Sequence, residues 1–553
     1  MKSRIITTTV AVLAMSMLAG CLRTETDPSP SHINPNAPIV PLEDDREVYD
    51  NEVPGVLNLY VEVLPGGATI EEVDDDTDWT DDSIPEANVR VSEDGYTFGN
   101  GSTSSDAKLR QRGHSARSAA QKSYRIRFDD ESTEWRDLNT LELNKHPYDL
   151  SRMRQKLSFT YFQSISDFTS LITQFIHLYI DGTDYGLYTL IERCNEEFLQ
   201  RHGLDEEGHL YKAEDFAFYR YPDNIMDPSD PNYSLEKFEE VLEIRGYDGN
   251  HEKLINMLDE VNDEEIDINT VIEDNFQRDN YLTWFAINIL LQNYDTNSQN
   301  FYLYSPTNSD GWYFLPWDYD GAWDFYGQAQ EAAANTRPRW TQGVSNWWNV
   351  VLHKRFLKDP DNVQALSDKV AELLNVFTDV ETTQLVEILS GWIFDIVTAE
   401  PDITDLPTIA DDIDDKIDEY VDELDRLPGI PAESYDIYAD TLDRPMPVWL
   451  GDPIQGDGVI AFNWDESYDL QGDAFTYDFQ VSTDPSFADA DIIYESLDRE
   501  SNEIEGASLD SGTYYFRVII RGVDDPDNNW QIAFDQYEAG DNYYYGVKQF
   551  VVE

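Results

Sequence analysis

The sequence is poor in cysteine and in basic residues, and it has no long apolar run beyond its first twenty residues. Only two cysteines occur in 553 residues. Lys and Arg number 38 against 110 Asp and Glu, which gives a formal net charge of −72. Because such a charge repels phosphate, it argues against a general nucleic-acid binder and against binding to anionic membranes. No segment after the first twenty residues is long and apolar enough to span a bilayer.

The first twenty residues have the pattern of a secretion signal. Lys2 and Arg4 precede an apolar run at residues 5–18, and Leu-Ala-Gly follows directly before Cys21. This order resembles a bacterial lipobox, in which Cys21 takes a lipid anchor and residues 1–20 are removed. An ordinary signal with a chance Cys is the alternative. If Cys21 is lipidated, Cys194 is the only thiol left and no intrachain disulfide can form.

These residues predict where the protein resides. We expect secretion across the inner membrane and a lipid anchor in the cell envelope or at the cell surface. Residues 21–50 are polar and contain several prolines, so we interpret them as a tether that holds the protein off the membrane.

The middle of the chain predicts a mixed α+β body. Apolar residues make up 41% and aromatic residues 13%, which allows large cores and excludes wholesale disorder. Alternating apolar residues, as at 57–63, indicate strands over 51–190. Helical spacing dominates 235–424, and 276–291 is an apolar amphipathic helix. We therefore predict a two-lobed body over residues 51–442.

The end of the chain predicts a separate all-β domain. A proline-containing break at 442–453 precedes about one hundred residues of short strands and turns, such as the alternating segment 513–520. This pattern is typical of a β-sandwich, and it resembles an immunoglobulin or fibronectin type III module over 455–553.

A basic island interrupts the acidic composition. Twelve of the 38 basic residues and only seven acidic residues lie between Lys108 and Lys156. Lys122 is in phase with the apolar face of the strand at 122–128, whereas Arg125 and Arg127 face the other way. A Lys on an inward face needs a buried anion, such as a nucleotide phosphate. Local salt bridges with the acidic remainder are the alternative.

An acidic counterpart follows the helix at 276–291. Asp295 and Asn300 lie five residues apart in a loop, and Asp318 and Asp320 end an apolar strand after a turn at 308–311. Protein kinases use this layout for the catalytic base and for metal ligands. Hard oxygen ligands suit Mg²⁺ or Mn²⁺. Capping of a hairpin by Asn and Asp is the alternative.

Together these segments resemble the CotH kinase family. The matching segments, in the order of the family, are residues 112–115 (Arg-Gly-His-Ser), 122–128, 153–157, 185–192, 295–300 and 316–320. The resemblance implies a secreted, divergent protein-kinase-like fold that transfers the γ-phosphoryl group of ATP to protein Ser or Thr with Mg²⁺ or Mn²⁺.

The resemblance also implies roles for single residues. Asp295 would orient or deprotonate the acceptor hydroxyl, and Asn300 and Asp318 would hold the metal, with Asp320 as an extra ligand. The nucleotide would contact four further residues: Arg112, Lys122 and Lys156 at its phosphates, and Glu192 near adenine.

A second hypothesis is a non-catalytic adhesion or matrix-binding protein on the same fold. Its partners would be other surface proteins or glycans, bound through the C-terminal domain or by the tryptophans Trp323, Trp340, Trp347 and Trp348. The presence of both Asp295 and Asp318 argues against this alternative. A glycosidase with paired carboxylates is a weaker third reading, because acidic residues are so abundant that a pair means little.

Overall fold

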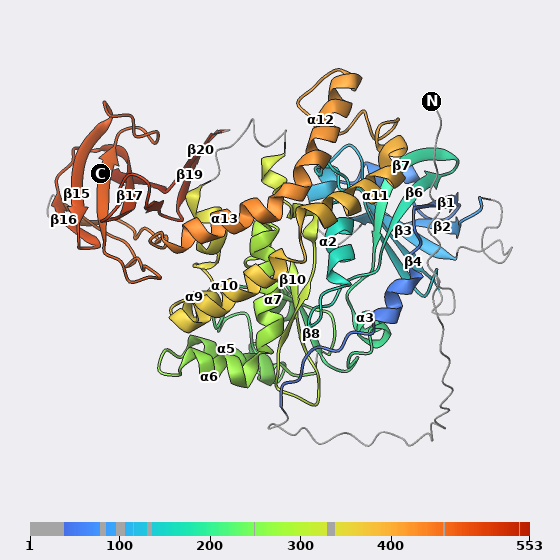
Figure 1. The fold of residues 1–553 in the computed structure, drawn as a ribbon, viewed down its shortest axis with the longest axis horizontal. Coiled ribbons are helices and arrows are strands. Elements are labelled where there is room, and N and C mark those ends of the chain that lie inside the picture. Colours follow the sequence, from blue (N-terminus) through green and yellow to red (C-terminus); the bar gives the residue numbers. More distant parts are fainter. Residues whose placement is uncertain are drawn as a thin grey trace.

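The computed structural model describes residues 38–77, 84–95, 106–113, 115–129, 135–247, 249–328, 338–456, 459–540 and 542–552. Outside these ranges lie the predicted signal at residues 1–20, the first part of the tether at 21–37, which includes Cys21, and His114. What we expect of these residues stays a prediction. Within the described part of the chain, no helix is both long enough and apolar enough to cross a bilayer. Figure 1 shows a sheet-rich N-terminal region, a helical middle and a β-rich C-terminal region, which confirms the mixed α+β prediction.

Seven strands near the N-terminus close into a barrel. Successive side chains of each strand point alternately into and out of the barrel. In β3, for example, the buried residues are Ala107, Leu109 and Gln111, and the residues between them are half-buried. The barrel closes because β1 pairs in parallel with β6. In spatial order the strands are β1 (Val56–Leu64), β2 (Ala87–Ser92), β3 (Ala107–Arg112), β4 (Ser123–Phe128), β5 (Thr140–Asn144), β7 (Thr183–Ile191) and β6 (Thr173–Ile180).

Residues 38–50 pack against this body, although we expected them to belong to the tether. Arg46 donates hydrogen bonds of 2.7 Å to the carbonyl oxygens of Ile165 and Phe168. Val48 and Tyr49 are buried beside it. The packed body therefore begins before residue 50, because these contacts join residues 46–49 to it. Three short helices accompany the barrel: α1 (Ile70–Asp74), α2 (Arg154–Phe162) and α3 (Glu196–Arg201).

A second sheet and a set of helices follow the barrel. The sheet has the order β11 (Tyr313–Pro316), β10 (Phe301–Ser305), β8 (His209–Ala213) and β9 (Leu242–Ile244). The helix expected at 276–291 is α7 (Arg278–Leu290), and all of its residues from Asn280 onward are buried. The other helices are α4 (Leu235–Glu239), α5 (Glu252–Asn262), α6 (Ile268–Asn275), α9 (Val351–Leu357), α10 (Pro360–Leu374), α11 (Asp379–Val397), α12 (Ile413–Arg426) and α13 (Ile430–Leu442).

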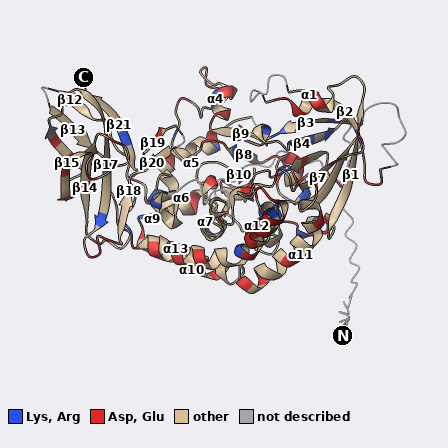
Figure 2. Ribbon diagram, turned by 90° about the horizontal axis from the view of Figure 1, so that it is seen from above, with Lys and Arg blue, Asp and Glu red and all other residues tan. Residues whose placement is uncertain are grey.

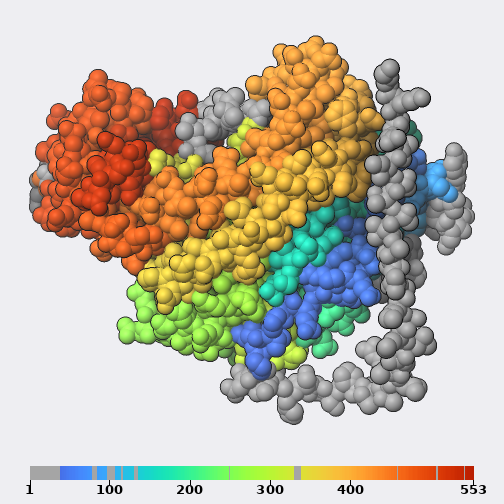
Figure 3. Space-filling model, viewed as in Figure 1, coloured from blue at the N-terminus to red at the C-terminus, as the bar shows by residue number. Residues whose placement is uncertain are grey.

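The C-terminal region is β-rich, as the sequence predicts, and it has a hydrophobic core of its own that includes Phe462, Phe479 and Phe516. Figure 3 shows it as a rounded mass beside the body. One sheet contains β12 (Ile454–Gly456), β13 (Val459–Asn463) and β16 (Glu503–Ala507). The other contains β15 (Ile492–Arg499), β14 (Phe475–Ser482), β17 (Gly512–Gly522), β18 (Trp530–Ile532) and β21 (Val547–Val552). A separate hairpin is formed by β19 (Gln536–Ala539) and β20 (Asn542–Tyr545).

A fully buried ion pair joins the barrel to the helical part. Lys145 Nζ lies 2.8 Å from Asp402 Oδ1, and both side chains are inaccessible to solvent. Asp402 also accepts a hydrogen bond of 2.9 Å from the backbone N–H of Leu187. Gly186 permits this approach, because a Cβ there would lie 1.8 Å from Asp402 Oδ2, and its φ of +76° also favours glycine.

We expect Asp402→Asn to lower the free energy of unfolding by roughly 3–5 kcal/mol, because Lys145 would lose its counter-charge at a site where burial already lowers the pKa of its amine to about 8. Urea denaturation followed by tryptophan fluorescence measures the loss. The double variant Lys145→Met with Asp402→Asn removes the charge as well and should recover much of the stability. An Asp402→Asn protein as stable as the wild type would contradict this account of the interface.

Candidate active site

A cavity of about 750 Å³ opens between the outer face of the barrel and the sheet that contains β8, β10 and β11. Its volume falls within the range of roughly 300–1,000 Å³ that is typical of small-molecule sites. Charged side chains of both signs line it. The cations are Arg112, Arg125, Arg193, Lys212 and Arg245, and the carboxylates are Glu142, Asp149, Glu214, Asp295, Asp318 and Asp320.

Five of the residues that the sequence analysis singled out meet in this cavity. They are Arg112, Asp295, Asn300, Asp318 and Asp320. Asp295 is almost two hundred residues from Arg112 in the chain, so the fold brings together the basic and acidic segments that the sequence shows separately.

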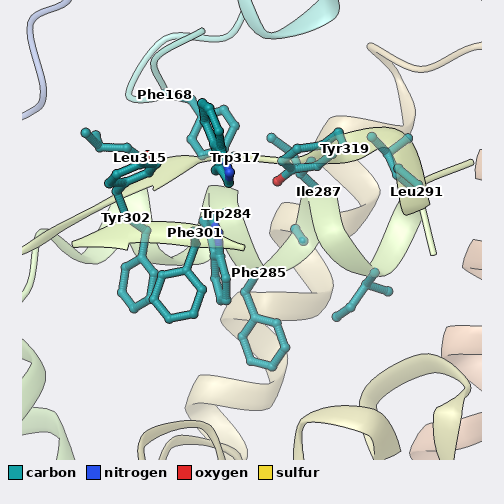
Figure 4. Packing of buried hydrophobic residues seen from close by; sticks show 14 of the residues in the cluster. Phe168, Trp284, Phe285, Ile287, Leu291, Phe301, Tyr302, Leu315, Trp317 and Tyr319 are labelled. Carbon is teal, nitrogen blue, oxygen red and sulfur yellow. The ribbon is translucent and has the colours of Figure 1, made fainter. Parts of the chain in front are cut away.

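Asp318 is held by its two neighbours in the chain. Trp317 and Tyr319 are both buried, and Figure 4 shows them in the aromatic core formed with residues of α7 and β10. The ring centres of Tyr319 and Phe162 lie 4.8 Å apart, and those of Trp317 and Tyr302 lie 5.4 Å apart. Asp318 itself has a φ of 56°, a left-handed conformation that Asp adopts more readily than most residues. The side chain is therefore fixed at the cavity by packing on either side of it.

Asp295 lies in a 3₁₀ turn, Tyr294–Thr296, directly after α7. Its two carboxylate oxygens accept hydrogen bonds from neighbouring amides, at 2.6 Å from Gln299 Nε2 and at 2.8 Å from Asn300 Nδ2. Burial raises the pKa of Asp295 to about 6, and the negative charge of Asp320 acts in the same direction. These bonds orient a carboxylate that can accept a proton near neutral pH.

Asp318 and Asp320 share one electrostatic environment. Burial, with the charges of Asp320 and Asp295, raises the pKa of Asp318 well above its ordinary value. Burial also tends to raise the pKa of Asp320, but hydrogen bonding and charge from His146 and the charge of Arg112 hold it below its ordinary value. His146 Nδ1 lies 3.2 Å from Asp320 Oδ2. The two carboxyl groups therefore shift each other's pKa in opposite directions at one wall of the cavity.

The opposite wall is basic and belongs to three adjacent barrel strands. Arg112 Nε and Arg125 Nε lie 2.6 Å and 2.7 Å from the two oxygens of Glu142. Burial would raise the pKa of Glu142, but the charges of Arg112, Arg125 and Arg193 outweigh it and keep the pKa below its ordinary value. Figure 2 shows Lys and Arg on β3 and β4, whereas α10, α11 and α12 carry mainly Asp and Glu. Three arginines thus act on one carboxylate, that of Glu142. The positive charge that Glu142 does not neutralise is available to an anion.

Three residues expected at the nucleotide are absent from the described lining of this cavity. Lys122 Nζ donates a hydrogen bond of 2.6 Å to the carbonyl oxygen of Arg117. Lys156 Nζ lies 2.5 Å from Glu52 Oε2 and donates to the carbonyl oxygen of Thr173 at 2.8 Å. These contacts hold the start of β4 and the α2 helix in place.

Glu192, which we expected near adenine, is fully buried in a network of its own. Its carboxylate pairs with Arg201, and Oε2 lies 3.1 Å from His202 Nε2 and 3.0 Å from the backbone N of Ile172. Nδ1 of the same histidine lies 2.6 Å from Asp44 Oδ1. The network ties the end of β7 to α3 and to the N-terminal segment.

The oxygen donors of the acidic wall suit a hard divalent cation. The described residues contain no group of three or more His, Cys, Asp or Glu side chains arranged to hold a metal by themselves. Mg²⁺ in phosphoryl-transfer sites is commonly held by one or two carboxylates together with substrate phosphates. Asp318 and Asp320 offer two carboxylates and Asn300 an amide oxygen at this cavity. Burial and the neighbouring charges of Asp320 and Asp295 raise the pKa of Asp318, and a cation beside these carboxylates would favour the ionised form of Asp318.

A family model described as CotH kinase protein matches residues 109–427, which is more than half of the chain. The chain belongs to the CotH kinase protein family. Inner spore coat protein H of Bacillus subtilis (strain 168) is 26% identical to it over 267 residues, covering 46% of this chain and 67% of that protein. All residues that line the cavity fall inside the segment matched by the CotH kinase model, and the C-terminal β-rich region falls outside it.

Sequence reasoning missed several residues of this candidate site. Arg125 and Glu142 line the cavity as a cross-strand pair of β4 and β5, and His146 binds Asp320. Alternation on β4 contains a signal for Arg125, because it points away from the apolar face. Lys212 and Arg245 carry no such signal, since the second sheet brings them to the cavity from distant positions.

The proposed glycan-binding tryptophans are core residues in this CotH kinase body, with one exception. Trp323, Trp347 and Trp348 are buried, so they cannot present a ring to a sugar. Trp340 is half-buried at the border with the C-terminal region. The prediction of an aromatic glycan surface is therefore wrong for the first three, and its reason is the large aromatic core around α7.

His202 gives this CotH kinase fold a pH-dependent stability. Burial tends to lower its pKa, but the charge of Glu192 and the hydrogen bonds to Asp44 and Glu192 raise it to about 9. Between the ordinary value of about 6.5 and this value, the folded chain retains a proton that the unfolded chain releases. The free energy of unfolding should therefore fall by on the order of 3 kcal/mol as the pH rises from 6.5 to 9.

Denaturation by urea at several pH values, for the wild type and for His202→Gln, measures this effect. The variant should lose stability at pH 6 and show a flatter profile up to pH 9. His353→Gln is the matched control, because burial lowers the pKa of His353 to about 3 and it stays neutral throughout this range. Identical pH slopes for His202→Gln and the wild type would refute the prediction.

Proposed function

We propose that this protein is a metal-dependent protein kinase that transfers the γ-phosphoryl group of ATP to a Ser or Thr hydroxyl. One observation carries the proposal: the Asp295, Asp318 and Asp320 carboxylates line the same cavity as Arg112 and Arg125. A nucleotide triphosphate with its cation has the complementary charges, and phosphoryl transfer depends mainly on positioning and electrostatic stabilisation. Membership of the CotH kinase family supports the same class of reaction.

Each of these residues would have a separate role in the reaction. The Asp295 carboxylate accepts the proton of the acceptor hydroxyl, whose oxygen forms a bond to the γ-phosphorus. The bond from the γ-phosphorus to the bridging oxygen breaks, and ADP leaves with that electron pair. Arg112 and Arg125 hold the phosphates, and their positive charge offsets charge that builds up on the phosphoryl oxygens.

Asp318, Asp320 and Asn300 would hold Mg²⁺ or Mn²⁺. When bound, the cation neutralises phosphate charge and acts as a Lewis acid. Lys122, Lys156 and Glu192 are left out of this proposal, because their partners lie elsewhere in the fold.

We further propose that the protein works outside the cytoplasm, held in the envelope or at the cell surface by a lipid on Cys21. The Leu-Ala-Gly-Cys sequence at residues 18–21 supports this location. A relative named for the inner spore coat is consistent with a surface location as well.

The test uses purified protein, γ-labelled ATP and either Mg²⁺ or Mn²⁺, with the chain itself and a library of Ser- and Thr-containing peptides as acceptors. Nucleotide affinity is measured in parallel by calorimetry. We expect metal-dependent binding and transfer, both abolished by a chelator. Absence of both binding and transfer would refute the proposal. Nucleotide binding without transfer to any acceptor would favour the non-catalytic adhesion or matrix-binding alternative.

A further inference from the structure

A second cavity, of about 370 Å³, adjoins the first and shares Asp295 with it. Its walls come from two parts of the chain that are far apart in sequence. The lining residues from the body are Tyr294, Asp295, Asn297, Tyr326, Pro338, Trp340, Thr341 and Asn346, and those from the C-terminal region are Gln536 on β19 and Tyr545 on β20. Figure 1 shows the β19–β20 hairpin on the side of the C-terminal region that faces the body.

Several contacts fix the C-terminal wall of this cavity. Arg339 donates hydrogen bonds of 3.1 Å to the carbonyl oxygens of Trp530 and Asn528, and its guanidinium lies 4.0 Å from the centre of the Trp530 ring. The rings of Trp340 and Phe534 lie 5.5 Å apart. Arg339 contacts Trp530 of β18, and Trp340 contacts Phe534, which lies two residues before β19. These contacts hold the β19–β20 hairpin at the cavity.

The chemistry of this cavity differs from that of its neighbour. Asp295 is the single charged residue among the described residues that line it, and four of the others are aromatic. This is unusual in a chain with a net charge of −72. A cavity lined by four aromatic side chains, with a single carboxylate at the border to the charged cavity, fits a polypeptide segment with apolar side chains.

We propose that this cavity binds the acceptor segment, with aromatic or apolar residues beside its Ser or Thr, and that the β19–β20 hairpin forms part of the acceptor site. The inference rests on the proposed function, because Asp295 joins the two cavities. The nucleotide occupies the charged cavity and the acceptor the aromatic one, so that the hydroxyl reaches Asp295 from the side of the C-terminal region. The overall acidity of the chain would by itself favour acceptors with Lys or Arg beside the Ser or Thr. The aromatic cavity instead predicts a preference for apolar neighbours over basic ones.

The test uses full-length protein and short synthetic peptides that differ only beside a single Ser, with Tyr or Leu, Lys, or Glu as neighbours. Transfer of labelled phosphate gives KM and kcat, and fluorescence anisotropy of labelled peptides gives binding without chemistry. We expect peptides with Tyr or Leu to be favoured about tenfold or more in kcat/KM. Tyr545→Ala should raise KM for these peptides about two- to tenfold, the range that one aromatic contact contributes, with kcat and nucleotide affinity little changed.

Two further variants sharpen the result. Trp340→Phe replaces the indole by a smaller ring that can still pack on Phe534, and should weaken peptide binding because it removes part of the aromatic wall. Tyr543→Ala is the matched control, because Tyr543 lies on the same strand, is exposed and is absent from the described lining of the cavity. A preference for Lys neighbours, or unchanged KM and peptide affinity in Tyr545→Ala, would overturn the inference while the kinase function stands. Peptide binding that depends on Tyr545, without transfer to any peptide, would instead overturn the kinase function and keep the binding site.

Discussion

Replacing Asp318 by Asn should lower the rate of phosphate transfer on the order of 10³-fold, because a cation held by this carboxylate contributes several kcal/mol of charge stabilisation. Asn has nearly the same size and tolerates the φ of 56° at this position, so the fold should be retained. The measurement is labelled-phosphate transfer over a titration of Mg²⁺ and Mn²⁺. We expect both a lower maximal rate and a higher metal concentration for half-maximal rate.

Asp181→Asn is the matched control for this variant. Asp181 also has a left-handed conformation, with a φ of 48°, but it lies in the turn between β6 and β7 and does not line the cavity. Its replacement should leave transfer unchanged. If Asp318→Asn retained the wild-type rate and metal dependence, the acidic wall would have no part in the reaction.

Replacing Asp295 by Asn should lower kcat by roughly 10²–10⁴-fold, the range that a general base contributes. Nucleotide affinity should change little, because Asp295 lies where the charged cavity meets the aromatic one and not among the arginines. Asp318→Asn should lower kcat and also raise the nucleotide dissociation constant. Measuring both constants therefore separates Asp295→Asn from Asp318→Asn.

The control for this variant is Asp215→Asn, a change of the same type at an exposed position just after β8. Circular dichroism and urea denaturation confirm that each protein is folded. An Asp295→Asn enzyme with wild-type kcat would show that the acceptor hydroxyl loses its proton to another group, and it would also weaken the acceptor site proposed beside Asp295.

The β4 strand illustrates how far alternation alone can predict a site. The pattern correctly separates the apolar face of Tyr124 and Ile126 from the face of Arg125, and the buried residues fill the barrel. We assigned the anion to the apolar face because of Lys122. The cavity lies on the outer face instead, where Arg125 meets Glu142 of the neighbouring strand. Alternation defines two faces, but only the closure of the barrel decides which of them borders the cavity.

The basic island has two separate roles in the structure. Part of it forms the basic wall of the cavity, as the hypothesis of a bound anion requires. Three other members form buried ion pairs, as the salt-bridge alternative requires: Lys145 pairs with Asp402, Arg154 with Asp149 and Glu423, and Lys156 with Glu52. A count of charges in a sequence window cannot separate these roles, because Asp402, Glu423 and Glu52 lie more than one hundred residues from their partners.

The sequence by itself determined the local features of this protein: its alternating strands, the buried helix before Asp295, the position of Asp318 between two aromatic residues, and the β-rich end. Each of these follows from spacing over a few residues, which local sterics and burial dictate. Only the tertiary structure decided that Arg112 and Arg125 face Asp318, that Lys156 and Glu192 serve the fold, and that the C-terminal hairpin borders Asp295. Those relations depend on the closure of the barrel and on the packing of the second sheet, and residues distant in the chain meet only after both have formed.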